Sequence, residues 1–177
     1  AKIYEETGNY KKAIDEYNEI IRLKDQDFDS LYKAGTISYE AGEWALAQQY
    51  FSLAVARNDS NPQLLYMLAN CYYQMRSYHA AQQHIQHALD LDPTNVQYHL
   101  LMGEVLSASR DFQNAVVELE IAYGSNALEN KDAISLQLAN SYYELGNYDK
   151  AKSYYEQVLN KEDIPNDKVV DERYRYA

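Results

Sequence analysis

The sequence is poor in cysteine, glycine and proline, and each scarcity excludes a class of protein. Among its 177 residues Cys71 is the only cysteine, which excludes an internal disulfide framework and a multi-cysteine metal site. The 6 glycines and 3 prolines are too few for the many tight turns of an all-β protein. Because 46% of the residues are hydrophobic and 24% are charged, the chain can bury a sizeable core and is not a disordered tail.

Long apolar runs and an excess of basic residues are also missing. No run approaches the roughly 18 apolar residues of a membrane-spanning helix, so we expect no membrane insertion. The chain has 16 Lys and Arg against 27 Asp and Glu, a formal net charge of −11. A duplex-binding surface needs clustered basic residues to neutralise phosphates, so we expect no nucleic acid partner. The acidic balance favours a basic or neutral partner.

What the sequence does contain is an internal repeat. Five segments that start at residues 8, 42, 76, 110 and 146 align without gaps, at spacings of 34, 34, 34 and 36. We call the first residue of each segment its anchor. Two residues after the anchor every repeat has an aromatic residue, and five after it every repeat has alanine: Tyr10, Trp44, Tyr78, Phe112 and Tyr148, then Ala13, Ala47, Ala81, Ala115 and Ala151.

Two further columns pair small residues with large ones. Seven residues before the anchor stand Ala1, Gly35, Ala69, Gly103 and Ala139, and nine residues after it stand Tyr17, Phe51, Ile85, Leu119 and Tyr155. The small residues let two helix backbones approach each other closely. We expect the aromatic column two residues after the anchor to fill the adjoining gap in the core.

Each repeat contains two stretches with helical periodicity. In the third repeat, Leu65, Leu68, Ala69 and Tyr72 follow the i, i+3, i+4, i+7 spacing of one helical face. Glycine at the anchor is typical of a left-handed helix end, whereas Arg76 and Arg110 predict that this turn is relaxed in two repeats. We expect helices at 9–23, 27–41, 44–57, 61–75, 78–90, 95–109, 112–123, 131–145, 148–160 and 166–176.

The pattern resembles the tetratricopeptide repeat (TPR) family over about residues 1–160. The resemblance implies an all-α fold, a right-handed α-α superhelix (solenoid) of about five helical hairpins, truncated at both ends. His99 and Ser135 replace leucine at one core column and should loosen the packing locally. As a fragment of a longer protein, the chain would form a single domain, 1–177, with repeats at 1–26, 27–60, 61–94, 95–129 and 130–163 and a partial sixth-repeat helix at 166–177. We expect this last helix either to cap the fifth repeat or to dock on another copy of the chain, with Val169 and Val170 on the apolar side of the contact.

Nothing in the sequence indicates catalysis or a cofactor. The motifs GxGxxG, GxxxxGK[ST], HExxH and GxSxG are absent, so we expect no enzyme and no cofactor. Cys71 lies in a strongly hydrophobic stretch, which favours a buried residue without reactivity. His79, His84 and His87 share one second helix, but without a third ligand they favour a solvated helix face over a metal site.

In a solenoid of this type the first helix of each repeat lines the concave side, and the residues there that the core does not use are candidates for binding a partner. Asn70 and Asn140 each offer a donor and an acceptor to a peptide backbone, and tyrosine is enriched at interfaces. The alternative is that some of these side chains pack between adjacent helices. The predicted groove residues are Tyr32, Lys33, Thr36, Tyr39, Tyr66, Met67, Asn70, Tyr73, Gln74, Leu100, Leu101, Glu104, Gln137, Asn140 and Tyr143.

We therefore predict a non-catalytic protein–protein interaction module, a scaffold or assembly factor that binds a basic or apolar peptide or helix of another protein. Two alternatives remain: a regulatory or substrate-recruiting arm of a larger enzyme, such as a glycosyltransferase, and a bacterial secretion or pilus-assembly factor. The carboxylate clamp of chaperone-binding TPR domains is not expected, because the matching places hold Tyr32, Thr36, Met67, Gln97 and Leu101. The sequence does not determine the compartment and favours the cytoplasm slightly.

Overall fold

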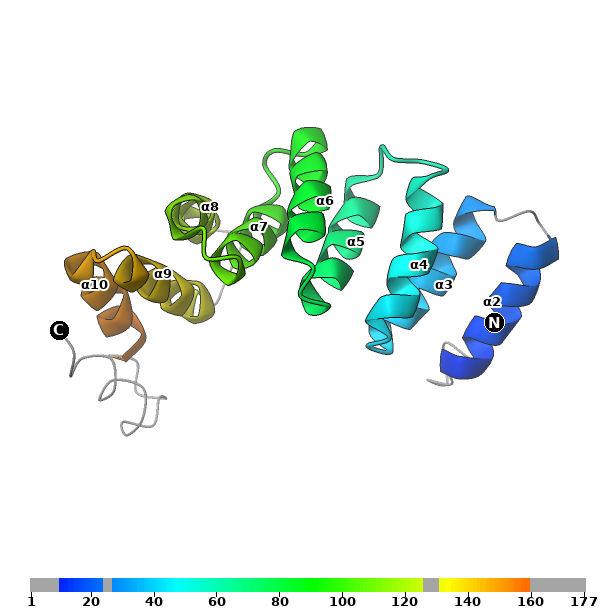
Figure 1. Cartoon of the computed structure of the whole chain (residues 1–177), viewed down its shortest axis with the longest axis horizontal. Helices are drawn as coiled ribbons and strands as arrows, with labels where there is room; N and C mark the ends of the chain where they lie inside the picture. Colours follow the sequence, from blue (N-terminus) through cyan, green and yellow to red (C-terminus); the bar gives the residue numbers. More distant parts are fainter. Residues whose placement is uncertain (1–9, 24–26, 126–130, 160–177) are drawn as a thin grey trace. The chain divides into compact units, whose positions relative to one another are not determined.

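The computed structural model describes residues 10–23, 27–125 and 131–159, and within these ranges the chain is helical with no strand (Figure 1). The helices begin and end within two residues of the predicted bounds. The predicted sixth-repeat helix, with Val169 and Val170, lies outside the described residues. The described helices are α2 (Tyr10–Leu23), α3 (Phe28–Glu40), α4 (Trp44–Val55), α5 (Pro62–Gln74), α6 (Tyr78–Leu91), α7 (Val96–Ala108), α8 (Phe112–Gly124), α9 (Asp132–Glu144) and α10 (Tyr148–Leu159).

The chain divides into two compact units, Ala1–Tyr98 and His99–Ala177. In the first unit α2 packs on α3, α3 on α4, α4 on α5 and α5 on α6, as Figure 1 shows. In the second unit α8 packs on α9 and α9 on α10. A hydrogen bond between His99 and Glu118 joins α7 to α8, and one between Ser107 and Ser141 joins α7 to α9.

The repeated small residues form the closest helix contacts of the core. All five alanines of the alanine column are buried, none more than 2% exposed. A Cβ atom added at Gly35 would lie 2.5 Å from two ring carbons of Phe51, and one added at Gly103 would lie 2.6 Å from Leu119. At Gly35 and Gly103 the first helix therefore receives the large residue of the second helix directly against its backbone.

The aromatic column lies at the edge of the core: Tyr10 and Trp44 are half-buried and pack against it, but none of the five rings is fully buried, so our expectation holds only in part. Its members are the first residues of α2, α4, α6, α8 and α10, at the ends of the helical hairpins. Tyr78 is half-buried and Tyr148 is 54% exposed, because the core is narrow at a helix end. The rings of Trp44, Tyr78 and Tyr148 instead contact those of Tyr39, Tyr73 and Tyr143, with centroids 5.2, 6.1 and 5.4 Å apart.

The hairpin turns keep the same left-handed helix end whether the anchor is glycine or arginine. The φ angle is 75° at Gly42 and 74° at Gly146, but also 60° at Arg76 and 67° at Arg110. The expected relaxation at the two arginines is therefore wrong. In each turn the anchor N–H and the next N–H bond back to the last turn of the helix, as Arg76 does to the Tyr73 carbonyl at 2.9 Å. These two bonds require a left-handed anchor residue.

Arg76→Gly is expected to stabilise the protein by about 0.5–1 kcal/mol, because glycine adopts a positive φ without the steric cost that an L side chain incurs. The free energy of unfolding, measured by urea denaturation, tests this. The matched control is Gly42→Ala, where the new Cβ meets no atom within 4 Å and only the backbone strain remains. That variant should be destabilised by a similar amount. Equal stability of Arg76→Gly and the parent chain would contradict the prediction.

Candidate functional site

The candidate site consists of the outward side chains of the first helices, which we call the first-helix face. In the first unit this face lies on α3 and α5. Lys33 and Gln74 are exposed there, and the other members are half-buried. In the second unit the face lies on α7 and α9, where its members are half-buried. The first-helix face comprises Tyr32, Lys33, Thr36, Tyr39, Tyr66, Asn70, Tyr73 and Gln74 in the first unit, and Leu100, Glu104, Gln137, Asn140 and Tyr143 in the second.

Two residues predicted for the groove belong to the core. Met67 is only 7% exposed, and its sulfur accepts a hydrogen bond from the Tyr32 hydroxyl at 3.8 Å. Leu101 is 2% exposed. Both stand immediately after a half-buried residue of the first-helix face, and the rotation of about 100° between neighbours on a helix turns them inward. Neither side chain is available to a partner.

The tyrosines of α3 and α5 are partly engaged within the first unit. The Tyr39 ring packs edge-on against Trp44, and burial, followed by the electrostatic effects of Tyr66 and Cys71, raises the Tyr39 pKa to about 12. Tyr66 stacks on Tyr98 with ring centroids 5.3 Å apart. Part of the surface of Tyr39 and of Tyr66 is therefore used for packing between helices, as the alternative prediction held. Their remaining exposed surface faces outward from α3 and α5.

The polar residues of the face differ in how far they are engaged. The Thr36 hydroxyl donates to the Tyr32 carbonyl within its own helix at 2.9 Å. The Asn70 carbonyl oxygen accepts from the Gln74 side chain at 3.3 Å, a long bond between exposed groups. The Asn140 carbonyl oxygen accepts from the Tyr155 hydroxyl at 2.5 Å. Asn140 thus anchors α10 to α9, a structural role that the sequence pattern did not indicate.

One pair on the first-helix face links two neighbouring repeats of the second unit. The side-chain amide of Gln137, on α9, donates to the Glu104 carboxylate, on α7, at 3.1 Å. Both side chains are half-buried. The repeat pattern predicted both residues for the groove but not their pairing, because they stand 33 positions apart.

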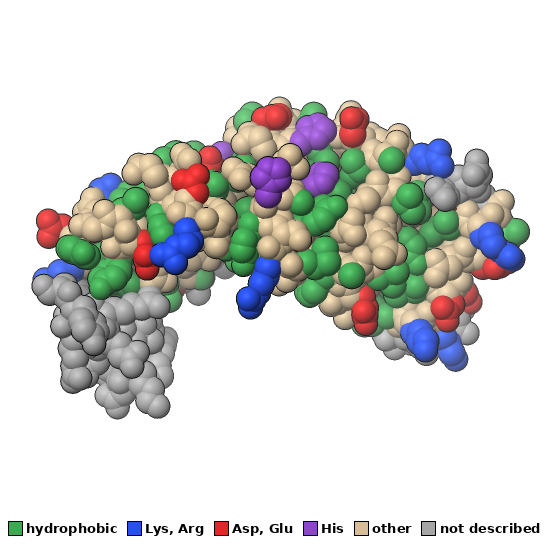
Figure 2. Space-filling view, viewed as in Figure 1, with side chains coloured by type: hydrophobic (Ala, Val, Ile, Leu, Met, Phe, Trp, Pro, Cys, Tyr) green, Lys and Arg blue, Asp and Glu red, His purple; other side chains and the backbone are tan. Residues whose placement is uncertain are grey.

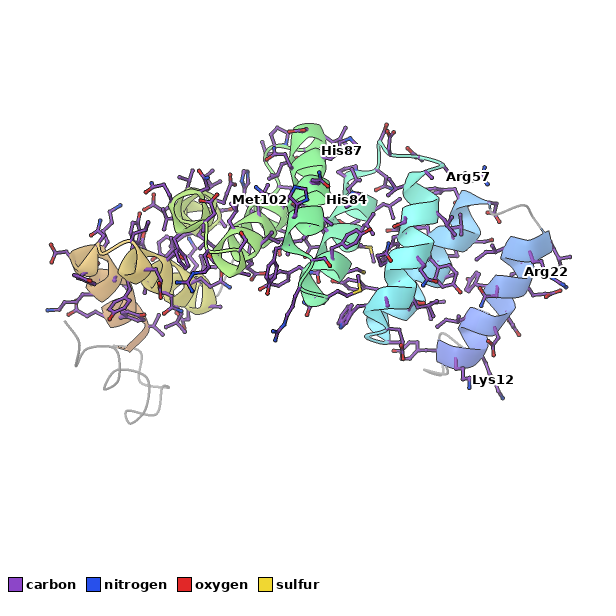
Figure 3. The ribbon with its side chains drawn as sticks, in the orientation of Figure 1. Lys12, Arg22, Arg57, His84, His87 and Met102 are labelled. Atoms are coloured by element: carbon purple, nitrogen blue, oxygen red, sulfur yellow. The ribbon has the colours of Figure 1, made fainter. Side chains whose placement is uncertain are left out.

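Cys71 and His84 both pack against other side chains of the first unit. Cys71 is fully buried, and burial raises the pKa of its thiol to about 12, so no reactive thiolate forms. Figure 3 shows His84 and His87 on α6. The His84 ring stacks on Tyr72 at 5.4 Å, and burial, followed by the charge of His87, lowers the His84 pKa. In the described ranges no three His, Cys, Asp or Glu residues gather as metal ligands.

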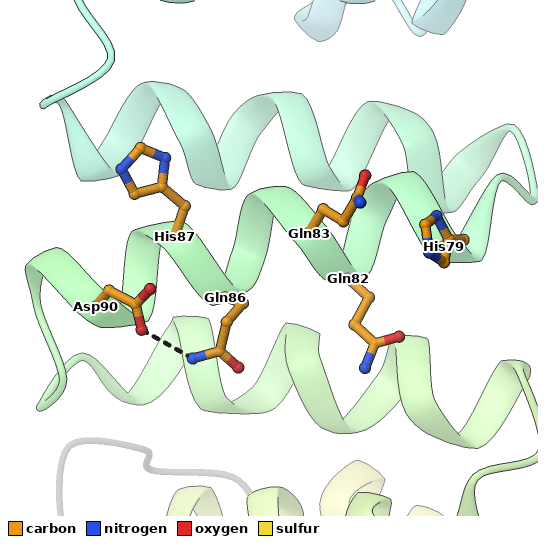
Figure 4. Close-up of a pocket in the computed structure, with 6 residues that line it drawn as sticks. All are labelled: His79, Gln82, Gln83, Gln86, His87 and Asp90. Atoms are coloured by element: carbon orange, nitrogen blue, oxygen red, sulfur yellow. Dashed lines mark hydrogen bonds between the residues drawn. The ribbon is translucent and has the colours of Figure 1, made fainter.

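A shallow hollow of about 480 Å³ lies along one face of α6 (Figure 4). All six residues that line it come from this single helix, and Gln86 donates to Asp90 within it at 3.0 Å. A second hollow of about 510 Å³ lies between α2 and α4, lined by nine residues that include Ile14 and Tyr50. Tyr50 donates to Asn18 there at 2.5 Å. The first hollow has no opposing wall, and neither brings together a nucleophile and a base.

Charged side chains do not form a basic patch on the face seen in Figure 2, where Lys and Arg are scattered singly or in pairs. The described part of the chain includes no helix both long and apolar enough to span a membrane. The four first helices carry one basic residue, Lys33, against five acidic ones: Asp29, Glu40, Glu104, Asp132 and Glu144.

Several solved protein structures have the same fold as this chain. A crystal structure of MamA protein shares 16% identity at a TM-score of 0.83, covering 99% of this chain and 90% of that one. A second crystal structure of MamA shares 18% identity at a TM-score of 0.82 and covers 90% of this chain and 92% of that one. The structure of MamA from Desulfovibrio magneticus RS-1 shares 14% identity at a TM-score of 0.82 and covers 92% of this chain and 93% of that one. The fold is thus the all-α solenoid of helical hairpins that the resemblance implied.

Sequence comparison identifies the repeats. A comparison with curated proteins found no match. Three family models, each described as Tetratricopeptide repeat, match residues 1–27, 38–105 and 134–163, which together span most of the chain. The matched segments contain the alanine column of four repeats and the left-handed turns at Gly42, Arg76 and Gly146. The chain belongs to the tetratricopeptide repeat family.

Proposed function

We propose that the chain is a non-catalytic module that binds a peptide or helix of a partner protein on its first-helix face, as a scaffold or assembly factor. Tetratricopeptide repeats are protein–protein interaction modules, which supports the class of this function. The finer proposal concerns where and how this chain binds.

The observation that carries the proposal is the composition of α5. This helix has no charged residue, yet Tyr66, Asn70 and Tyr73 are only half-buried on its outward side. Tyrosine provides apolar area and a polar tip, and asparagine provides a donor and an acceptor for a peptide backbone. Tyrosine is enriched at protein interfaces relative to the rest of the protein surface. A partner segment laid along α5 would cover their exposed parts.

The partner is first identified by pull-down with the chain as bait and mass spectrometry, and its binding segment is then synthesised for affinity measurements. Asn70→Ala is expected to weaken binding of that segment about 2- to 10-fold, because one net hydrogen bond contributes about 0.5–1.5 kcal/mol. Asn140 is less suitable for this test, since its loss would also release Tyr155. Isothermal titration calorimetry measures the affinity, and the melting temperature reports the fold.

The matched control is Gln49→Ala, a polar-to-alanine change at an exposed position of the second helix α4. It should leave the affinity unchanged. If instead Gln49→Ala weakens binding while Asn70→Ala does not, the partner lies on the second helices and the proposed face is wrong.

A further inference from the structure

The Glu104–Gln137 pair holds a carboxylate in a fixed position on the first-helix face. Gln137 uses its amide nitrogen to hold one oxygen of the Glu104 carboxylate at 3.1 Å. Its own carbonyl oxygen is buried and is the single buried side-chain polar atom without a hydrogen-bond partner in the described part of the chain. Because that oxygen is covered, a donor from a bound partner can reach the Glu104 carboxylate but not this atom.

Among the described residues of the second unit, no Lys or Arg pairs with Glu104. Helices α7 and α9 contain no Lys or Arg. The four described basic residues of the unit all contact other groups: Arg110 contacts Glu144 at 3.7 Å, Lys131 the Tyr123 carbonyl at 2.6 Å, Lys150 the Tyr142 hydroxyl at 2.8 Å and Lys152 Glu156 at 3.8 Å. The half-buried Glu104 carboxylate is therefore held in place by an amide, and none of the described basic residues of the unit neutralises it.

We propose that the Glu104 carboxylate, held in place by Gln137, receives a cationic side chain, Lys or Arg, of the bound partner. Lys and Arg carry only donors, which matches a carboxylate that carries only acceptors. A hydrogen bond from a charged donor to a carboxylate is stronger than one between neutral groups. The net charge of −11 and the acidic excess on the first helices favour the approach of a cationic segment. This inference rests on the proposed function and specifies the chemistry of its ligand.

A metal ion is a poorer occupant of the same site. Calcium takes about 6–8 oxygen ligands, and magnesium requires a near-ideal octahedron. Glu104 and Gln137 supply two ligand groups, and the described residues contain no third acidic or histidine side chain grouped with them. A side-chain cation needs only hydrogen bonds to the acceptors already present.

The test uses short random peptides displayed on phage and selected on the whole chain. Selected peptides should carry Lys or Arg at a recurring position. A synthetic copy is compared with an analogue in which that residue is replaced by its neutral isostere, citrulline for Arg or acetyl-lysine for Lys. On the parent chain the neutral analogue should bind about 10-fold or more weakly. The difference should shrink at high salt, because ions screen a partly exposed charge pair.

Glu104→Gln preserves the shape of the side chain and removes its charge. This variant should bind the cationic peptide about 10-fold more weakly than the parent chain does, and should bind the cationic and neutral peptides nearly equally. The control is Glu156→Gln, the same substitution in the same unit at an exposed position of α10, paired with Lys152 at 3.8 Å. Exposed pairs contribute little, so its affinity should stay within about twofold of the parent.

The inference and the proposed function fail in different ways. If peptides bind and Asn70→Ala weakens them, but Glu104→Gln discriminates against the neutral analogue as strongly as the parent chain does, the cation site is overturned and the function stands. If no peptide is selected, or binding survives every first-helix substitution, both are overturned. The comparison of the two peptides on the unaltered chain needs no variant, so a folding defect in Glu104→Gln cannot obscure the result.

Discussion

Phe51→Ala is expected to lower the free energy of unfolding by about 3–5 kcal/mol, the range for truncating a buried aromatic residue. The Phe51 side chain is fully buried and packs against the rings of Tyr32 and Tyr39. The ring centroids lie 6.2 and 6.4 Å from that of Phe51. Its removal would leave a cavity between α3 and α4, because the surrounding helices cannot collapse fully into the space. Urea denaturation followed by far-UV circular dichroism measures the loss.

The neighbouring repeats provide a matched control for this contact. Gly35→Ala should cost about 1–3 kcal/mol, since its Cβ would lie 2.5 Å from the Phe51 ring. The double variant Gly35→Ala/Phe51→Ile reproduces the pair found at Ala69 and Ile85 in the next repeat. It should recover part of that loss. A stabilising effect of Gly35→Ala alone, as at an unconstrained helix glycine, would contradict the close contact.

His99→Leu is expected to lower the free energy of unfolding by about 1–3 kcal/mol, although leucine stands at this column in two other repeats. The Nδ1 atom of His99 lies 2.7 Å from the Glu118 carboxylate, and the two side chains are 13% and 24% exposed. Leucine cannot hydrogen-bond this carboxylate, which would remain partly buried without its partner. Because both groups are partly solvated, the cost stays below the about 3–5 kcal/mol of a fully buried pair. Thermal and urea denaturation measure it.

The double variant His99→Leu/Glu118→Met separates the pair from the packing. Replacing both partners of a buried pair by apolar residues of similar size is often neutral or stabilising. We therefore expect the double variant to be at least as stable as the parent chain. Destabilisation of the double variant as large as that of His99→Leu would show that packing around residue 99, and not the lost partner, determines the cost. The sequence analysis expected His99 to loosen the core; its bond to Glu118 replaces the missing apolar contact.

The candidate site was predictable as a set of positions but not as a set of interactions. Helical periodicity and the repeat placed Tyr39, Asn70 and Glu104 on first helices, away from the residues that the core requires. These sequence signals could not show that Asn140 hydrogen-bonds Tyr155 or that Gln137 hydrogen-bonds Glu104, because the bonds join residues 15 and 33 positions apart. Side-chain pairing across helices depends on their axial offset and rotation, which no local pattern encodes. Binding at this face stays a prediction until a partner is measured.

The helices and their repetition follow from the sequence alone, because amphipathic periodicity and the alanine column are local or strictly periodic signals. The bounds of every described helix agree with those signals within two residues. Only the tertiary structure shows which side chains are buried. Met67 and Leu101 lie in the core, whereas Tyr148 is largely exposed. The left-handed conformation of Arg76 and Arg110 also depends on tertiary contacts. Packing of the first helix against the second imposes the same turn in the four repeats whose turns are described, and that constraint outweighs the intrinsic preference of an arginine backbone.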